Sequence, residues 1–419
     1  MAATATTLGA ALRLRGRSTI NHGAAHRPRS SAQSRRAVSG LALLASIGAQ
    51  VSACGEPERR APSDSARGAA AVGRVPASSA VAPVEPGSLG SGVIYTANEG
   101  GRSISRIDLA SGRVATFPIG LSPHNVQISR DGRQLFAIGT VSGGMPDMGM
   151  PDSVSSAGGK AKDDARAGPG QLLILDAAAT DTAAATRVTV GREPAHVILD
   201  AAGARAYTTS GAANAVLVVD VARRRVIDTI STAASPHGLR MRPDGRELYV
   251  AATVGNAVSV LDVARQREVA RIPVGRGPVQ VGFLPDGAHF YVSLRDDNAV
   301  AVIDTKRRRV VARISVGRSP IQLFATPDGH SVYVANQGTE AQPDSTVSVI
   351  DTRRNAVVAT LITGRGAHGV VVSDDGRRVF VANTFAGTVS VIDVAAQRVI
   401  GTVRVGAGPG GITYRAPSP

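Results

Sequence analysis

Three of the five methionines in the chain fall within six residues, in the stretch GGMPDMGMPD at 143–152. Met145, Met148 and Met150 are interleaved there with Pro, Asp and Gly. Thioether sulfur is a soft ligand that suits Cu(I), so this spacing raises copper binding as a hypothesis. The alternative is a plain loop. The stretch is surrounded by Gly, Ser and Ala, and the entropy lost when such a loop becomes ordered would weaken metal binding.

Histidine is the second residue type that could do chemistry here. Four histidines stand near the start of apolar runs, in SPHNV, EPAHV, SPHGL and GAHGV, and the nearby places in other runs hold glutamine or glycine. Imidazole ligates metal ions and, when protonated, binds anions. The alternative is that these histidines bond to neighbouring backbone. The candidate ligand-binding residues are His124, His196, His237, His368, Gln280 and Gln322.

A metal site would combine the Met stretch with the three histidines that come first in the chain, His124, His196 and His237. Arginines add to the same region, because they recur in VGR or TGR just before the His and Gln positions. With these side chains they could form a positive funnel for a small anionic ligand; the alternative is a repeated feature of a solvated loop. These arginines are Arg192, Arg276, Arg318 and Arg365.

Three basic runs, at 223–225, 306–309 and 353–354, could touch phosphates of lipid or nucleic acid. Exposed charges in hairpins also discourage edge association, which is the alternative. Sequence-tolerant nucleic-acid binding usually adds stacking aromatics, and most aromatics of this chain fall inside apolar runs. We therefore expect no nucleic-acid partner. The sequence contains no recognisable catalytic motif, so no catalytic residue is predicted and enzyme activity stays open.

Residues 1–54 are typical of an export leader. They carry seven of the arginines and no acidic residue, which leaves a formal +8 of the total +15 for the rest of the chain. A basic segment at 13–36 precedes an apolar run at 37–51 that is too short to span a bilayer. The run ends in Val51-Ser52-Ala53-Cys54, which resembles the bacterial lipobox, and Cys54 is the one cysteine of the chain. We expect lipidation at Cys54; cleavage after Ala53 without a lipid is the alternative.

Residues 55–90 are rich in Ala, Pro, Ser, Gly and Arg and show no periodicity. Such a composition cannot bury enough apolar surface to offset the entropy of ordering. We expect a linker between the anchor and a folded domain.

A repeat begins at about residue 91 and extends to about 415. The aspartate that closes each VID-like run recurs at intervals of 68, 44, 42, 42, 47 and 42 residues, which defines seven units. The long interval holds an insertion at about 140–170 that contains the Met stretch. The seven aspartates are Asp108, Asp176, Asp220, Asp262, Asp304, Asp351 and Asp393.

Each unit contains four short alternating runs rich in Val and Ile, separated by turn residues such as PDG at 243–245. Four strands per unit and a period near 42 predict an all-β, seven-bladed β-propeller with four-stranded antiparallel blades. The region starts with a second strand and ends with a first strand, so the C-terminal strand should complete the N-terminal blade. One aromatic per unit should pack between blades.

The segments LYVAATVGNAVSVLDV, VYVANQG…STVSVIDT and VFVANTFAGTVSVIDV resemble the YVTN family of bacterial and archaeal propellers, over about residues 91–415. The resemblance implies an extracytoplasmic location. There is a weaker similarity to lactonase-type propellers. Because the repeated residues build blades, the resemblance says little about function.

These patterns predict a monomeric propeller, anchored by lipid to a membrane in the periplasm or at the cell surface, that serves as a binding or scaffold module through its rim. Its partner would be an unknown protein or a small anionic ligand. The alternatives are a periplasmic copper-binding or metal-handling protein and a lactonase-type hydrolase. No cofactor is established by the sequence; copper is the candidate.

Overall fold

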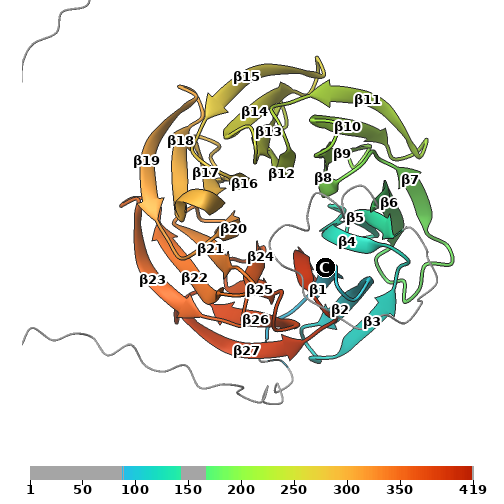
Figure 1. Ribbon diagram of the computed structural model, residues 1–419. Coiled ribbons are helices and arrows are strands. Elements are labelled where there is room, and N and C mark those ends of the chain that lie inside the picture. The colour runs from blue at the N-terminus through green and yellow to red at the C-terminus, as the bar shows by residue number, and fades with distance from the viewer. Residues whose placement is uncertain (1–86, 88, 143–166, 418–419) are drawn as a thin grey trace, which may run out of the picture. The chain divides into compact units, whose positions relative to one another are not determined.

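The computed structural model describes residues 87, 89–142 and 167–417. In these residues, 28 strands form seven four-stranded antiparallel sheets, and the 3-10 turn η1 (Arg295–Asp297) is the one helical element. The sheets stand as blades around a central channel (Figure 1). This confirms the predicted seven-bladed β-propeller.

The innermost strand of each blade lines the channel, and it contacts the innermost strands of both neighbouring blades, so the ring is closed. In blade order these strands are β28 (Pro409–Arg415), β4 (Ser122–Ile128), β8 (Pro194–Leu199), β12 (Pro236–Met241), β16 (Pro278–Phe283), β20 (Pro320–Ala325) and β24 (Ala367–Val372).

The second and third strands of the blades are mostly buried, because both of their faces pack against neighbouring blades. The second strands are β1 (Val93–Asn98), β5 (Gln134–Ser142), β9 (Arg205–Ser210), β13 (Glu247–Ala252), β17 (His289–Leu294), β21 (Ser331–Gly338) and β25 (Arg378–Asn383). The third strands are β2 (Ser103–Asp108), β6 (Ala167–Asp176), β10 (Ala215–Asp220), β14 (Ala257–Asp262), β18 (Ala299–Asp304), β22 (Pro343–Asp351) and β26 (Thr388–Asp393).

The outer strands face solvent on one side, and in several of them exposed residues alternate with more buried ones. They are β3 (Val114–Pro118), β7 (Thr186–Thr189), β11 (Arg225–Ser231), β15 (Arg267–Pro273), β19 (Arg309–Ser315), β23 (Ala356–Ile362) and β27 (Arg398–Arg404).

The C-terminal strand closes the ring as predicted. Strand β28 pairs antiparallel with β1, and the pair includes Tyr95 opposite Thr413 and Thr96 opposite Ile412. The first blade is therefore built from both ends of the repeat region, which leaves no innermost strand of the ring without a partner.

Short polar turns join the strands as the sequence indicates. In the turn Pro243-Asp244-Gly245, Gly245 has a φ of 72°, and the Asp244 carboxylate accepts a hydrogen bond of 3.0 Å from the Arg246 amide. The VID aspartates act in the same way on the third-to-fourth-strand hairpins. Asp262, for example, accepts a hydrogen bond of 2.8 Å from the Arg265 amide.

The predicted aromatic column is also confirmed. Its seven members are at most 1% exposed and pack in the clusters between blades, and the Tyr95 hydroxyl donates to the Ala177 carbonyl of the next blade at 2.7 Å. They are Tyr95, Phe136, Tyr207, Tyr249, Tyr291, Tyr333 and Phe380.

The Met stretch, Cys54 and the predicted leader lie outside the described residues. Strands β5 and β6, which pair with each other, flank the segment 143–166. In the part of the chain that is described, no helix is long and apolar enough to cross a bilayer.

Candidate metal centre

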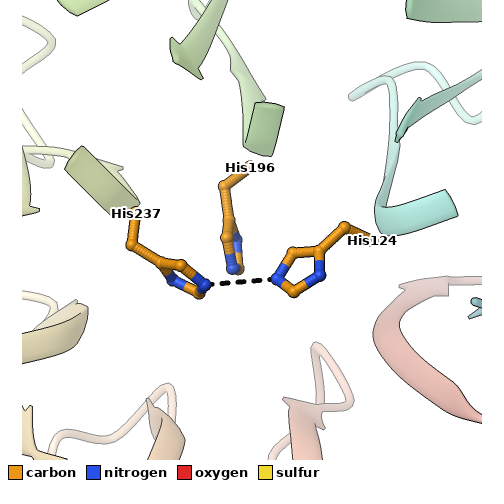
Figure 2. Close-up of side chains that lie close together, drawn as sticks. All are labelled: His124, His196 and His237. Atoms are coloured by element: carbon orange, nitrogen blue, oxygen red, sulfur yellow. Dashed lines mark hydrogen bonds between the residues drawn. The ribbon is translucent and has the colours of Figure 1, made fainter. Parts of the chain in front are cut away.

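Three of the predicted histidines come together at one end of the channel. His124 on β4, His196 on β8 and His237 on β12 each offer a ring nitrogen, and these three nitrogens lie within 4.8 Å of one another. The ring centroid of His237 is 5.1 Å from that of His124 and 5.1 Å from that of His196. Figure 2 shows the three rings approaching one another from three different inner strands.

A β-bulge explains why His196 joins the other two although it stands one position later in its strand. In β12 the pairing with β13 skips from Pro236 to Leu239, and in β8 the pairing with β9 skips from Pro194 to Val197. Strict alternation would send adjacent residues to opposite faces of a strand. The bulge breaks that alternation at the start of the strand, so two successive positions can both supply side chains to the channel.

Hydrogen bonds to neighbouring blades fix the backbone that carries these histidines. The Thr209 hydroxyl donates to the His237 carbonyl at 2.9 Å and accepts from the His196 amide at 3.0 Å. The Ser235 amide, just before β12, donates to the Asn214 side-chain carbonyl at 2.8 Å. Blade 3 therefore holds the first residues of blade 4 in register with its own.

The ring nitrogens of His237 have separate tasks. Its Nδ1 lies 3.3 Å from the Val279 carbonyl, and because a carbonyl can only accept, Nδ1 carries the hydrogen. In a neutral ring Nε2 is then an acceptor, and it lies 3.2 Å from Nε2 of His124. A proton on His124 Nε2 completes this contact. His237 can therefore bond to neighbouring backbone through Nδ1 and bind a ligand through Nε2, so the two interpretations of this histidine are compatible.

Glu99, in the connection between β1 and β2, was not identified from the sequence. One of its carboxylate oxygens lies 3.3 Å from His124 Nδ1, and its side chain is 51% exposed. Burial alone would lower the pKa of His124, but the charge and hydrogen bond of Glu99 outweigh it and raise that pKa above its usual value. Burial raises the pKa of Glu99, but the neighbouring histidines, His124 above all, outweigh burial and lower that pKa overall. A sequence signal for this pairing is absent, because the residues belong to different blades.

The other two histidines are kept neutral. Burial, with smaller contributions from the charges of His124 and His368, lowers the pKa of His237 to about 3. Burial holds the pKa of His196 well below its usual range, and the charges of His237 and His124 lower it further. His196 is 2% exposed, and its Nε2 has no hydrogen-bond partner among the described residues. An unpartnered buried polar nitrogen is costly unless something binds it.

This arrangement matches the requirements of a transition-metal ion. A tetrahedral ion with bonds of about 2.0–2.1 Å separates its ligand nitrogens by about 3.3 Å. The 3.2 Å between Nε2 of His124 and Nε2 of His237 already has this value. No separation in the group exceeds 4.8 Å, so the nitrogens need to approach one another by at most about 1.5 Å to bind such an ion.

The remaining channel residues surround the triad. The ring centroid of His368 is 6.1 Å from that of His124, and its Nδ1 lies 3.1 Å from the Gly410 carbonyl. Burial and the charge of His124 lower the pKa of His368 to about 4. Gln280 and Gln322 are buried, with their amide oxygens accepting from Val281 and Val370 amides. They add polar groups beside the inner strands, and among the described residues they make no hydrogen bond with the triad.

The four arginines lie apart from the triad. Arg276 pairs with Asp297 at 2.7 Å and Arg318 lies 3.9 Å from an oxygen of Asp344, while Arg192 and Arg365 are exposed. Two members of the predicted positive funnel thus have carboxylate partners on the same face. These partners are Asp297 for Arg276 and Asp344 for Arg318.

Fold and site together define a seven-bladed β-propeller whose channel mouth holds convergent imidazoles. Residues 171–311 match the family model of the YNCE-like beta-propeller, and residues 290–406 match that of the Cytochrome D1 heme domain. The seven blades, together with the match at 171–311, support a seven-bladed propeller of the YVTN/YNCE type. No curated protein matches it.

Solved structures show the same fold at low sequence identity. Kuenenia stuttgartiensis hydrazine synthase is 21% identical, with a TM-score of 0.55 over 71% of this chain and 96% of that chain. A functionally unknown protein from Desulfotomaculum acetoxidans DSM 771 is 15% identical, with a TM-score of 0.62 over 78% of this chain and 100% of that chain. These likenesses support the fold.

The match to a heme domain raises the question whether the histidines suit heme. A porphyrin occupies four iron positions in its plane and leaves one axial position on each face. The three nitrogens of His124, His196 and His237 gather within 4.8 Å, so they cannot all be axial ligands of one heme. The matched segment contains His368 but none of these three. The triad therefore fits a single ion and not a heme.

Proposed function

We propose that the protein is an extracytoplasmic propeller module, anchored by lipid at Cys54, that binds a divalent transition-metal ion at its channel mouth. His124, His196 and His237 are the ligands. The observation that carries the proposal is the convergence of their ring nitrogens within 4.8 Å. Three imidazoles suit Zn²⁺, Cu²⁺ or Ni²⁺, and three protein ligands leave a coordination position for a ligand that arrives from the rim.

Glu99 serves as the outer partner of this site. A carboxylate that accepts from the second nitrogen of a ligating histidine fixes the ring and makes the first nitrogen a better donor. Without metal, His124 is held as an imidazolium between Glu99 and His237. The ion would take the place of the proton between the two Nε2 atoms, so binding should release about one proton near pH 6.5.

The test is titration of the purified, chelator-treated protein with ZnCl₂ and CuCl₂ by calorimetry. We expect one ion per chain, and an affinity that is about 100-fold or more weaker in His196→Ala. His330, which is exposed and lies at a turn on the opposite face, supplies the matched control His330→Ala. Equal affinities in wild type and His196→Ala would rule out the site.

Repeating the titration in buffers of different ionisation enthalpy counts the protons released. Glu99→Gln should reduce the release near pH 6.5, because the pKa of His124 then falls. If the release is the same in both proteins, Glu99 has no part in the site.

A copper-handling role remains a second candidate, because β5 pairs with β4, the strand of His124, and β5 and β6 flank the segment with Met145, Met148 and Met150. Cu(I) titration against a competing chelator distinguishes a site that includes the methionines from a site made by the histidines alone. If the methionines contribute, their triple replacement by serine should weaken Cu(I) binding and leave Zn²⁺ binding unchanged. Unchanged Cu(I) binding would remove the methionines from the proposal.

Three protein ligands with an open position are also the pattern of catalytic zinc sites, so a lactonase-type activity is testable on the same residues. Lactone turnover by the zinc-loaded protein should then be lost in His196→Ala and kept in His330→Ala. Turnover absent from the wild type, or equal in all three proteins, leaves the module as a binding protein for a rim partner.

The anchor is tested separately. In a bacterial host the protein should partition with membranes and incorporate labelled fatty acid, and Cys54→Ser should abolish both. Label incorporation that survives the substitution would contradict lipidation at Cys54.

A further inference from the structure

A second cavity lies at the other end of the channel, where the inner strands of three consecutive blades end. It has a volume of about 130 Å³ and is lined by β12, β16 and β20. Its lining residues are Arg240, Met241, Gly282, Phe283, Leu323, Phe324 and Ala325. Six of these seven are apolar or glycine, and the exception is one cation.

Arg240 is held in place without a counter-ion. Its guanidinium carbon lies 5.3 Å from the centroid of the Phe324 ring, a cation–π arrangement that fixes the side chain. Among the described residues we find no ion pair and no side-chain hydrogen bond of Arg240. Burial lowers the pKa of Arg240 to about 10, so the group is still charged at neutral pH.

The surroundings do not compensate this charge. Among the titratable groups of the described residues, His196 is the one that Arg240 influences. The positive charge of Arg240 helps to lower the pKa of His196, so the interaction with a protonated His196 is repulsive. A largely buried cation without a partner is unfavourable, and the cost is relieved when an anion binds beside it. The site is accessible to such an anion, because Arg240, Phe283 and Phe324 are each partly exposed.

Glycine 282 keeps the space open. A Cβ at Gly282 would collide with the side chain of Leu323, so any other residue would push Leu323 out of its position in the cavity wall. The neighbouring inner strands carry bulkier residues at the equivalent place, Arg240 on one side and Phe324 on the other. The glycine therefore leaves open, apolar space beside the contact between Arg240 and Phe324.

We propose that this cavity binds a small organic monocarboxylate, with its carboxylate on Arg240 and its apolar body between Phe283, Leu323 and Phe324. The size is suitable, because an apolar cavity of about 150 Å³ accommodates benzene. One guanidinium matches one carboxylate in two parallel hydrogen bonds. A doubly charged phosphate would leave charge uncompensated against apolar walls. The site is independent of the metal centre.

Benzoate is the probe, and calorimetry or saturation-transfer NMR on the purified protein is the measurement. We expect saturable 1:1 binding, and binding of the neutral analogue benzyl alcohol that is about ten- to a hundredfold weaker. Inorganic phosphate and chloride should not compete at equal concentration. If phosphate binds as tightly as benzoate, the cavity does not select an organic carboxylate and the proposal is overturned.

Arg240→Met keeps the apolar stem and removes the charge, and it should weaken benzoate binding by about ten- to a hundredfold. Arg242→Met, two residues later at a turn where Arg242 pairs with Asp244 and Glu247, removes the same charge outside the cavity and should change nothing. If Arg240→Met does not fold by circular dichroism, Arg240→Lys should retain charge and partial binding. Benzoate binding that is absent from the wild type, or equal in both arginine variants, overturns the proposal.

Discussion

Burial keeps three of the channel histidines neutral, and the contact with Glu99 makes His124 the exception. His237 and His368 use Nδ1 on a backbone carbonyl of the next blade, which leaves Nε2 for the channel. His124 uses Nδ1 on Glu99, which favours its charged form. One imidazolium beside neutral imidazoles is the stable arrangement of several close histidines, because two adjacent cations would repel. The proton then occupies the place that a metal ion would take.

The pH dependence of stability follows from these pKa values. His237 has a folded pKa of about 3 against about 6.5 when unfolded, so below pH 6.5 the unfolded chain binds the additional proton. The metal-free protein should therefore lose up to about 1.4 kcal/mol of unfolding free energy per pH unit from this residue between about pH 6 and 4. His196 and His368 act in the same direction. His124 opposes them, because its raised pKa stabilises the fold below pH 6.5 and that contribution disappears as the pH rises.

Urea unfolding of the wild type and of His237→Gln at pH 7 and pH 5 measures the contribution of His237 to the pH dependence of stability. The substitution should flatten the pH dependence, whereas His330→Gln, at an exposed position, should leave it unchanged. An equally steep dependence in His237→Gln would show that this histidine is not kept neutral in the fold.

At the scale of the element, the site depends on a bulge that all seven inner strands share. Each pairs regularly with its neighbour except at its first residues, as in β24, where the register shifts between Ala367 and Gly369. Small residues make this possible in several blades. Gly238 is the clearest case, because a Cβ there would collide with the Gln280 side chain and the Val279 carbonyl of the next blade.

Gly238→Ala should therefore destabilise the protein by about 1–3 kcal/mol. It should also weaken metal binding, because the adjacent His237 bonds to the same Val279 carbonyl. Thermal unfolding and zinc titration measure the two effects. Gly245→Asn is the control, since that turn has open space and a positive φ that asparagine tolerates. A fully stable Gly238→Ala with normal zinc affinity would contradict the packing described here.

At the largest scale, the described blades form a ring whose closure depends on pairing of β1 with β28. Strand β28 also touches β4 and β24, so it completes the channel wall beside His124 and His368. Loss of this one strand would expose an edge of β1 and remove the contacts that β28 makes with β4 and β24. Closure and site formation are thus linked.

A chain that ends at Gly408 should be less stable than the full chain by about 3 kcal/mol or more, because the buried Ile412 and the β1 pairing are lost. Zinc affinity should fall with it. A chain that ends at Arg415 keeps β28 and should behave as the full protein. Unfolding temperature and limited proteolysis distinguish the two truncations. Equal stability would mean that the ring does not need β28.

The sequence by itself determined the architecture. Asp-closed runs at intervals near 42 residues predict seven blades, because each blade repeats the same local turns and alternation. The closing strand follows from where the repeat starts and ends. The candidate histidines were also evident, since His124 and His237 stand at equivalent places and His196 one residue later in three consecutive units.

Only the tertiary structure decided how these residues meet. The bulge brought His196 into line with His124 and His237, although alternation would have separated them. Glu99 and the uncompensated Arg240 became visible only when distant blades were placed side by side. The physical reason is that period and turn chemistry are local properties of the chain, whereas proximity, burial and pKa depend on contacts between blades.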